Sequence, residues 1–531
     1  MVRHSDPDAK FYLVGAGIAS LSAAAFLIRD GGVRGSNITI LQESTQLGGS
    51  LDAGGDRKSG YSMRGGRMFE SKYVCTFDLF SSIPTLDGTQ TVTQEIFAWN
   101  ETMKTSSKSR LFRNGKSIDA PALGLDEMQI LQIERLVLEP ESLLGRTSIA
   151  DQFDKEFFHT DFWLMWCTTF AFQPWHSAVE FKRYLVRFTH MICGFNTLSG
   201  IMRTVYNQYD SMVRPLWKWL EERGVEMRYD IQVTALDLNH DSIGYAADRI
   251  MFEKDGRQDE ILLGESDFVI VTLGSMTEGS SLGANDRAPL LLDKTVGGAW
   301  SLWKSIADGR KDCGKPGNFS DHIGESKWLS FTSTLTNTVF FDFIRDVTGN
   351  APGEGGLITF PESSWLMSIV LPHQPHFLGQ PTDVQVFWGY GLRVDGIGDF
   401  TKKPMSACTG EELMIEVLGH LGLMDGAKRV LEASNCIPCM MPFITSQFLQ
   451  RSHGDRPEVI PERSKNIAFV GQYCEVPDDV VFTVEYSVRS AQTAVYGLLG
   501  MERKPPPVYK GEHSLRVLLE AYLALHETAL R

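Results

Sequence analysis

The sequence lacks an excess of basic residues. Lysine and arginine together number 51, whereas aspartate and glutamate number 66, so the formal net charge is −15 at pH 7. A surface of this sign repels the phosphate groups of nucleic acids. The charge balance therefore argues against non-specific nucleic-acid binding, and no nucleic acid is expected as a partner.

Long apolar runs are missing as well. We find no stretch of about 18 apolar residues that could cross a bilayer, and the first ten residues, MVRHSDPDAK, carry charges and a proline where a secretory signal would be apolar. We therefore expect a cytoplasmic protein without an integral membrane segment. Segment 514–531, SLRVLLEAYLALHETALR, predicts a packed amphipathic helix, with weak contact to a membrane surface as the alternative.

Cysteine is sparse. Eight cysteines in 531 residues stand at irregular spacings, which is typical of reduced, buried thiols and not of a disulfide framework. Cys436 and Cys439 form one CxxC, but no second CxxC or histidine pair accompanies it, so no metal is predicted.

What the sequence does contain is enough apolar material for a large interior. Hydrophobic residues make up 43% of the chain, charged residues 22% and aromatic residues 11%, as in globular proteins with an aromatic-lined core. The length predicts two or three structural units and leaves room for a buried cofactor.

The N-terminal sequence predicts a βαβ unit. A short apolar strand at 11–14 is followed by a glycine turn, a helix of small and apolar residues that ends near 31–32, and a second strand in NITILQES at 37–44.

The turn of this unit has the pattern of a dinucleotide-binding fingerprint. In GAGIAS, Gly15 permits the tight turn, Gly17 lets a pyrophosphate approach the backbone, and Ser20 is small enough to keep the helix close to the strand. Glu43, after the second strand, is the acid expected to bind a ribose hydroxyl.

Downstream glycines indicate FAD as the dinucleotide. Gly48 and Gly49 are followed by the run Arg64-Gly65-Gly66-Arg67, and the strand in NIAFVGQ ends just before Gly471, as a strand returning to the flavin would. The later pair Gly389 and Gly391 has neither a small third residue nor a following helix, so a second nucleotide domain for NAD(P)H is not expected.

These signals predict the α/β fold class, with a Rossmann-type FAD-binding domain, an interleaved mixed α+β substrate domain and a helical cap. We assign 1–90, 216–290 and 461–531 to the FAD-binding domain together with a C-terminal helix. Segment 91–215 is the mostly helical cap, and 291–460 is the mixed substrate-binding domain.

Several longer strings carry a resemblance to a known family, between about residues 11 and 499. They are GAGIASLSAAAFLIRDGG, YSMRGGR, FAFQPWHSAVEFKRYLVRF, YNQYDS, VTLGSMTEGSS, WLMSIVLPHQPHF, CIPCMMPFITSQF, RSHGDRPEVIPE and FTVEYSVRSA. The sequence resembles the oleate hydratases, once called myosin-cross-reactive antigens. The resemblance implies FAD-dependent addition of water to the cis-9 double bond of oleate, giving 10-hydroxystearate, with no net redox role for the flavin.

The resemblance also implies catalytic residues. Tyr184, in KRYL, is the expected proton donor. Where the family motif RGGREME has its first glutamate, this chain has Met68, whose thioether cannot take a proton. Three explanations are open: Glu70 replaces the missing acid, other dipoles orient the water, or activity is lost. We favour retained, slower activity with Glu70 as an aid.

Cofactor and substrate contacts follow from the same resemblance. For the carboxylate of the fatty acid, Gln208 and His376 match polar contacts of the family, whereas Val370 and Pro372 replace a threonine and an asparagine, which predicts weaker head-group binding. The expected FAD contacts are Gly15, Gly17, Ser20, Glu43, Gly49, Arg64, Gly65, Gly66, Arg67, Ser275, Phe482, Thr483 and Glu485.

Two other readings stay open at this stage. A flavin oxidoreductase of a lipophilic substrate, similar to amine oxidases or desaturases, shares the glycine fingerprint, and an inactive FAD- or fatty-acid-binding protein would explain Met68. Both ends are short relative to larger family members, which suggests a monomer.

Overall fold

The computed structural model describes residues 6–118, 123–292 and 297–526. The predicted C-terminal helix is present as α16 (Leu515–His526), and its last five predicted residues lie outside the described residues. Within the described residues, no helix is both long and apolar enough to cross a membrane.

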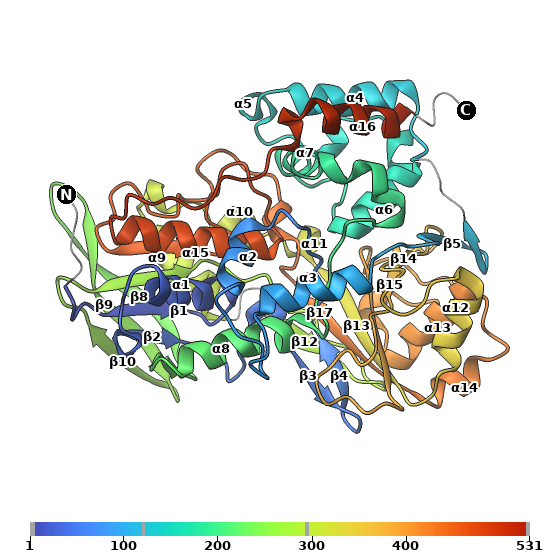
Figure 1. The fold of residues 1–531 in the computed structure, drawn as a ribbon, viewed down its shortest axis with the longest axis horizontal. Helices are drawn as coiled ribbons and strands as arrows, with labels where there is room; N and C mark the ends of the chain where they lie inside the picture. The colour runs from blue at the N-terminus through green and yellow to red at the C-terminus, as the bar shows by residue number, and fades with distance from the viewer. Residues whose placement is uncertain (1–5, 119–122, 293–296, 527–531) are drawn as a thin grey trace.

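A five-stranded parallel sheet forms one half of the molecule, on the left in Figure 1. The predicted βαβ unit is confirmed: β1 pairs with β2, and α1 (Ile18–Arg29) connects them. Ten residues of α1 are buried, because small side chains let the helix lie close to the sheet and to α15 (Val484–Leu498). In spatial order the strands are β18 (Ile467–Val470), β11 (Phe268–Thr272), β1 (Phe11–Val14), β2 (Ile38–Leu41) and β7 (Glu226–Arg228).

An antiparallel three-stranded sheet lies beside this half. Its strands are β8 (Gln232–His240), β9 (Tyr245–Lys254) and β10 (Arg257–Leu262). These strands pair only with one another and do not join the parallel sheet.

The other half, on the right in Figure 1, contains an eight-stranded sheet whose pairs are antiparallel apart from β14 with β5. Helices α12 (Val339–Thr348), α13 (Gly410–Leu421) and α14 (Ala427–Leu431) lie on its outer side. The spatial order is β12 (Ser281–Leu282), β17 (Ser434–Met441), β13 (Trp328–Leu335), β16 (Gln385–Gly391), β15 (Met367–Val370), β14 (Ile358–Thr359), β5 (Leu111–Arg113) and β6 (Lys116–Ile118).

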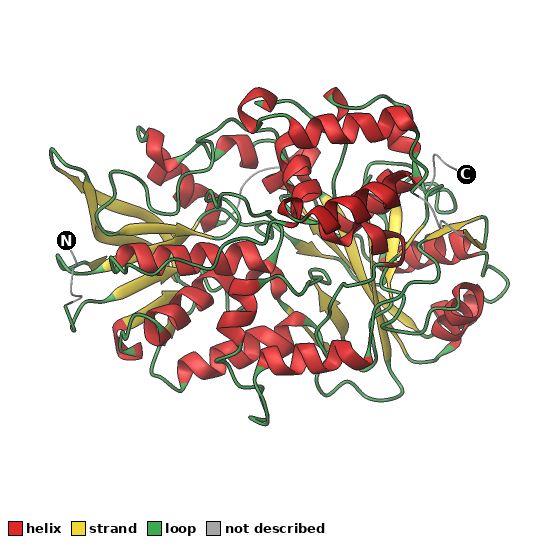
Figure 2. Ribbon diagram, turned by 45° about the horizontal axis from the view of Figure 1, so that its top comes forward, coloured by secondary structure: helices red, strands yellow, loops and turns green. Residues whose placement is uncertain are grey.

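The hairpin β5–β6 falls inside the segment predicted as mostly helical. Its strands have three residues each, too few for a period-two pattern, and β5 is held by a long-range parallel pair with β14. Several helices of that segment gather with α16 into one group at the top of Figure 1, whereas α3 (Val92–Thr102) lies apart from them near the middle of the molecule. Figure 2 shows helices on both sides of the strands. The group consists of α4 (Glu127–Leu138), α5 (Glu141–Leu144), α6 (Asp161–Phe170), α7 (Ala178–Arg187) and α16.

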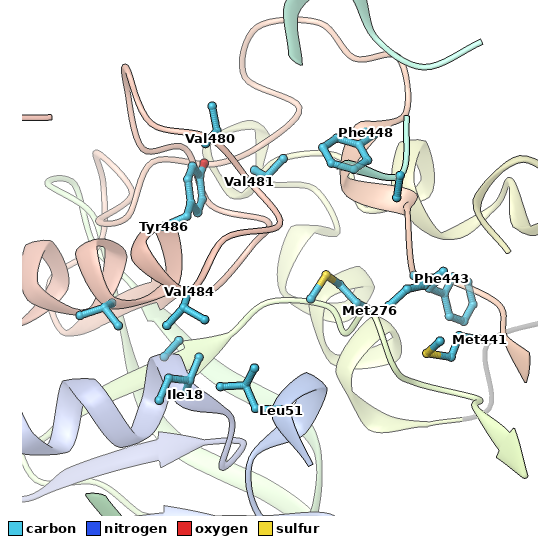
Figure 3. Close-up of a cluster of buried hydrophobic side chains, with 14 of the residues drawn as sticks. Ile18, Leu51, Met276, Met441, Phe443, Phe448, Val480, Val481, Val484 and Tyr486 are labelled. Carbon is cyan, nitrogen blue, oxygen red and sulfur yellow. The ribbon is translucent and has the colours of Figure 1, made fainter. Parts of the chain in front are cut away.

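The core where these parts meet is assembled from distant segments. Figure 3 shows Ile18 and Leu51 from the N-terminal segment, Met276 after β11, Phe448, and Val484 at the start of α15. All five side chains are buried. The chain therefore returns to this core from several segments that are far apart in sequence.

Candidate functional site

A large cavity opens at the carboxyl ends of the parallel strands, where ligands of doubly wound sheets bind. Its empty space is about 1630 Å³, and we call it the nucleotide cavity. It is lined by residues 14–19, 41–44, 46, 48–50, 52, 64, 231, 233, 272–279, 297–299, 302, 471–473 and 487.

Glycines keep one wall of the nucleotide cavity open. Gly15 has a φ of +91°, and an added Cβ would lie 3.3 Å from Oγ1 of Thr272. Gly17 precedes α1, and an added Cβ would meet no atom within 4 Å. The backbone of Gly17 therefore faces open space, although its extended conformation suits any residue. An added Cβ at Gly49, φ +57°, would lie 3.3 Å from Cα of Gly17.

The predicted acid also lines this cavity. Both oxygens of Glu43 accept a hydrogen bond from the backbone N–H of Gly298, at 3.0 and 3.1 Å, at the start of α9 (Gly298–Ala307). This contact holds the carboxylate in a fixed orientation beside the glycine turn. The glycine wall, the N-terminus of α1 and the oriented carboxylate together fit a dinucleotide.

Arg64 and Ser275 are two further predicted residues in the wall of the nucleotide cavity. Arg64 Nε lies 3.0 Å from Oδ1 of Asp52, and its Nη1 donates to Sγ of Cys439 at 3.3 Å. The carbonyl of Ser275 accepts a hydrogen bond from Nε1 of Trp300 at 3.1 Å. Cys439, one half of the CxxC, is a free, buried thiol.

Ser20 lies behind this wall and not in it. Its hydroxyl is 2.8 Å from Oγ1 of Thr272, so it ties α1 to the end of β11. Gly65 lines neither the nucleotide cavity nor the cavity described next. A Cβ there would lie 3.3 Å from Nη1 of Arg67 and 3.4 Å from the ring of Trp388. We conclude that these two residues position the wall.

A second, mostly apolar cavity of about 760 Å³ brings the predicted catalytic residues together. We call it the apolar cavity. Tyr184, Met68 and Glu70 all line it, with Phe482 and Thr483 at its side. The remaining lining residues are Gly66, Arg67, Phe69, Tyr73, Trp166, Thr169, Phe170, Phe188, Met191, Ile192, Gly194, Phe195, Leu198, Ser199 and Ile201.

Tyr184 projects from α7 into a setting that keeps its phenol protonated. Its hydroxyl donates to the carbonyl of Val481 at 2.6 Å. Burial raises the pKa of Tyr184 well above its ordinary value, and nearby Arg67 acts in the opposite direction. A positive charge at this place stabilises the phenolate that forms when the proton is given away.

Glu70 is ionised and anchored. Arg187 Nη2 lies 2.8 Å from Oε1, the N–H of Lys72 donates to Oε2 at 2.7 Å, and His190 Nε2 is 3.4 Å from Oε2. Burial alone would raise the pKa of Glu70, but the contact with His190 and the charge of Arg187 hold it below its ordinary value. Glu70 is therefore a hydrogen-bond acceptor and a weak base. Met68, two residues away, adds only a thioether to the same cavity.

Arg67 and the start of α15 form the side of the apolar cavity. The Arg67 guanidinium lies 4.7 Å from the ring centre of Phe482, and its Nη2 is buried without a hydrogen-bond partner among the described residues. Burial lowers the pKa of Arg67 to about 10. Thr483 caps α15, since its hydroxyl accepts a 3.1 Å hydrogen bond from the N–H of Tyr486.

Glu485, one of the predicted FAD contacts, binds groups of the protein in this structure. Its carboxylate accepts from the N–H groups of Cys75 and Thr76, at 3.0 and 2.8 Å, and pairs with Arg489 at 2.8 Å. It lines neither cavity. With its oxygens bound by Arg489 and by N–H groups at the start of α2 (Val74–Phe80), Glu485 joins α2 to α15.

A third, smaller cavity contains the residues predicted for the substrate head group, and we call it the side cavity. Gly66 lines both the side cavity and the apolar cavity, so the two adjoin at this glycine. The full lining is Met63, Gly66, Trp99, Met103, Arg203, Thr204, Val205, Gln208, Gly353, Val370, Pro372, His373 and His376.

The two residues predicted to bind the head group, Gln208 and His376, have different surroundings. The Gln208 amide accepts from the N–H of Arg67 at 3.2 Å and donates to its carbonyl at 3.1 Å, so it clamps this backbone. Burial, helped by the charge of Arg203, lowers the pKa of His376 to about 3, which leaves a neutral ring at pH 7.

The sequence analysis missed Arg203 and the aromatic wall of the apolar cavity. Phe195 and Phe188 lie in apolar segments of the sequence that would fit any buried helix. Only the tertiary structure shows that they line a cavity. For Arg203, the one available signal was its place three residues before YNQY.

Comparison with known proteins identifies relatives over nearly the whole chain. Residues 8–496 match the model of the MCRA family. The chain is 37% identical over 528 residues to an oleate hydratase of Streptococcus pyogenes serotype M49 (strain NZ131), covering 97% of this chain and 89% of that protein. It is 33% identical over 538 residues to a linoleate hydratase of Lactiplantibacillus plantarum, covering 93% and 94%.

Solved structures share the fold at low identity. Cyclohexylamine oxidase from Brevibacterium oxydans IH-35A has a TM-score of 0.54 at 11% identity, covering 93% of this chain and 99% of its own. Wild-type putrescine oxidase bound to putrescine has a TM-score of 0.50 at 11% identity, with the same coverage. These likenesses support the predicted α/β fold class and carry no information on the reaction.

Proposed function

Because the chain belongs to the MCRA family, we propose that it is an FAD-dependent fatty acid hydratase that adds water to the cis-9 double bond of oleate to give 10-hydroxystearate. The observation that carries the proposal is that one apolar cavity holds both a buried, protonated Tyr184 and an ionised Glu70.

The walls of the apolar cavity suit an alkyl chain. Hydrating an isolated alkene requires a proton donor at one carbon, water at the other, and exclusion of bulk solvent. Aromatic side chains supply the exclusion, and their faces bind CH₂ groups without hydrogen bonds. They are Trp166, Phe170, Phe188 and Phe195.

Tyr184 donates its phenolic proton to C9, and the oxygen of a water molecule bonds to C10. Arg67 stabilises the phenolate, and the proton that the water loses returns to Tyr184, so the net change is the addition of one water molecule. Glu70 accepts a hydrogen bond from that water. Because the pKa of Glu70 is held low, it orients the water better than it removes a proton, which favours slow turnover.

FAD is the proposed resident cofactor in the nucleotide cavity. When bound, it orders the site and supplies electrostatic stabilisation without net redox change. With FAD bound, the backbone N–H groups at the N-terminus of α15 would offer partial positive charge to the cofactor from the position of Thr483. The proposed contacts are Gly15, Gly17, Glu43, Gly49, Arg64 and Ser275 in the nucleotide cavity, and Gly66, Arg67, Phe482 and Thr483 beside the apolar cavity.

The test is incubation of FAD-loaded protein with a flavin reductant and oleate in water enriched in ¹⁸O, followed by mass spectrometry of the products. Labelled 10-hydroxystearate without consumption of oxygen supports the hydratase. Oxygen consumption with an oxidised product would support a flavin oxidoreductase, and oleate binding without any product would support a binding protein.

We also propose a monomer that acts in the cytoplasm and touches membrane surfaces weakly through α16. That helix buries Val517 and Ala521 but exposes apolar side chains, namely Leu515, Leu518, Leu519, Tyr522 and Leu523. Co-sedimentation with phospholipid vesicles that weakens in Leu519→Glu, with an unchanged sedimentation coefficient in solution, is the expected result.

A further inference from the structure

The backbone of Arg203 is held in the wall of the side cavity by the side chain of Asn100. Its N–H donates to Oδ1 of Asn100 at 2.9 Å, and its carbonyl accepts from Nδ2 of the same side chain at 2.7 Å. Asn100 is on α3 (Val92–Thr102), which also contributes Trp99 to the cavity. The starting point of the arginine side chain is therefore fixed.

The guanidinium of Arg203 has no counterion among the described residues. Its Nε and Nη2 atoms are buried and lack hydrogen-bond partners there. Burial lowers the pKa of Arg203 to about 10, so the group stays charged at pH 7. A Cβ at Gly356, φ +68°, would lie 3.1 Å from Nη2, so this glycine leaves room for the charged end.

A buried charge without a partner is unfavourable and is tolerated when a ligand supplies the opposite charge. The other lining residues offer little to an anion. Val370 and Pro372 have no side-chain donor, and His376 is neutral. Among the described lining residues, Arg203 alone carries a full charge.

This inference rests on the proposed function. We propose that Arg203 binds the carboxylate of the fatty acid in the side cavity, while the alkyl chain passes Gly66 into the apolar cavity. The guanidinium presents Nε and Nη2 along one edge, the pair of donors that a carboxylate accepts in a bidentate contact. Arg203 thereby selects free acids over esters and alcohols. Its charge also compensates for the hydrogen-bonding side chains that Val370 and Pro372 replace.

The experiment measures binding and so does not depend on turnover. Equilibrium dialysis of the FAD-loaded protein compares oleate with oleyl alcohol, which has the same chain and no charge. The wild-type protein is expected to bind oleate about 10- to 100-fold more tightly. In Arg203→Met this preference falls to about one, with the affinity for oleyl alcohol unchanged, and Arg203→Lys recovers part of it.

Lys104→Gln is the matched control. Lys104 follows Met103 of the cavity wall, is 70% exposed and pairs only with Glu101, so its loss removes a nearby positive charge without touching the cavity. The control is expected to keep the preference for oleate. A wild-type protein without preference, or Arg203→Met with full preference, would overturn the assignment.

The melting temperature of ligand-free Arg203→Met shows whether a loss of oleate binding reflects poor folding. Because Nε and Nη2 of Arg203 have no hydrogen-bond partner in the part of the chain that the structure describes, ligand-free Arg203→Met should melt at or above the temperature of the wild type. A clear drop would mean that Arg203 is structural and would also overturn the proposal. If carboxylate preference holds but no labelled hydroxystearate forms, the hydratase proposal fails while the assignment of Arg203 stands.

Discussion

The side chain of Tyr184 is buried, and its hydroxyl donates a hydrogen bond to the carbonyl of Val481. Tyr184→Phe removes the proton donor and leaves the aromatic packing intact, so turnover of oleate should fall by about 10²- to 10⁴-fold. The stability cost is about 1 kcal/mol. Product formation by mass spectrometry and FAD content by absorbance are the measurements. Unchanged turnover in FAD-loaded Tyr184→Phe would exclude this residue as the donor.

Met68 stands beside Glu70 in the wall of the apolar cavity. Met68→Glu adds a carboxylate that is free of the contacts with Arg187 and His190, so it is a better base than Glu70. We expect turnover to rise by about tenfold or more. Met68→Gln, which has nearly the same shape and no charge, is the control and should not share the gain. Equal rates for both variants would show that the site does not lack a base.

Single residues were predictable where a local motif specifies them. Gly15, Gly17 and Glu43 belong to a short pattern with a direct physical reason, and all three line the nucleotide cavity. Gln208 and Glu485 instead bind backbone groups far away in sequence. A sequence shows that such side chains are polar, but it does not show whether their partner is the protein or a ligand.

At the scale of elements, α7 is locked in place by a buried ion cluster. Glu180, one turn before Tyr184, has Oε1 at 2.7 Å from Arg451 Nε and at 2.8 Å from Arg456 Nη1. All three side chains are buried. This cluster joins α7 to the segment after β17 and so fixes the direction in which Tyr184 points.

The cluster predicts a pH dependence of stability. Burial opposes ionisation, but Arg456 and Arg451 lower the pKa of Glu180 to about 2. Because the folded pKa lies below the unfolded value of about 4.3, the ion pairs stabilise the fold fully above that pH. Their contribution, about 3 kcal/mol, is lost as pH falls toward 2.

Glu180→Gln should therefore lower the free energy of unfolding by about 3 kcal/mol at pH 7, because it leaves two arginines buried without their partner. Denaturant titrations should show the difference from wild type shrinking below about pH 4. Glu141→Gln is the control. Glu141 pairs with Arg183 of α7 but is more exposed than Glu180, so its substitution should lower the free energy of unfolding by less than about 1 kcal/mol. A pH-independent difference would contradict the assignment.

Among the elements, long periodic segments were the predictable ones. The strand at Phe11–Val14, α1 and α16 appear where their apolar patterns placed them. The hairpin β5–β6 was missed because its pairing partner, β14, is more than 200 residues away in sequence. Local pattern carries no information on such a pair.

At the scale of the whole molecule, the nucleotide cavity joins three distant segments of the chain, 14–52, 272–279 and 471–473. A ligand that binds only the folded protein stabilises it, by about 2.7 kcal/mol at 100 times its dissociation constant. Removal of FAD should therefore lower the melting temperature, and added FAD should restore it. A melting temperature that does not respond to FAD would contradict the cofactor proposal.

Gly17→Ala distinguishes an effect on FAD binding from an effect on the stability of the fold. Since an added Cβ at Gly17 meets no atom within 4 Å, the FAD-free variant should melt within about 1 °C of the FAD-free wild type, a shift worth a few tenths of a kcal/mol. The methyl group occupies the approach of the pyrophosphate, so the rise on adding FAD should be lost. Gly15→Ala, at φ +91°, is the contrasting variant and should lower stability even without FAD.

The sequence alone determined the βαβ unit, the dinucleotide fingerprint and the membership of a family, because these depend on residues close together in the chain or on long characteristic strings. Only the tertiary structure decided which polar side chains face a cavity. Arg203 is an ordinary arginine in the sequence, and it becomes a ligand-binding candidate because folding buries its guanidinium without a counterion among the described residues. Burial and pairing are properties of contacts between distant segments, which local sequence patterns do not specify.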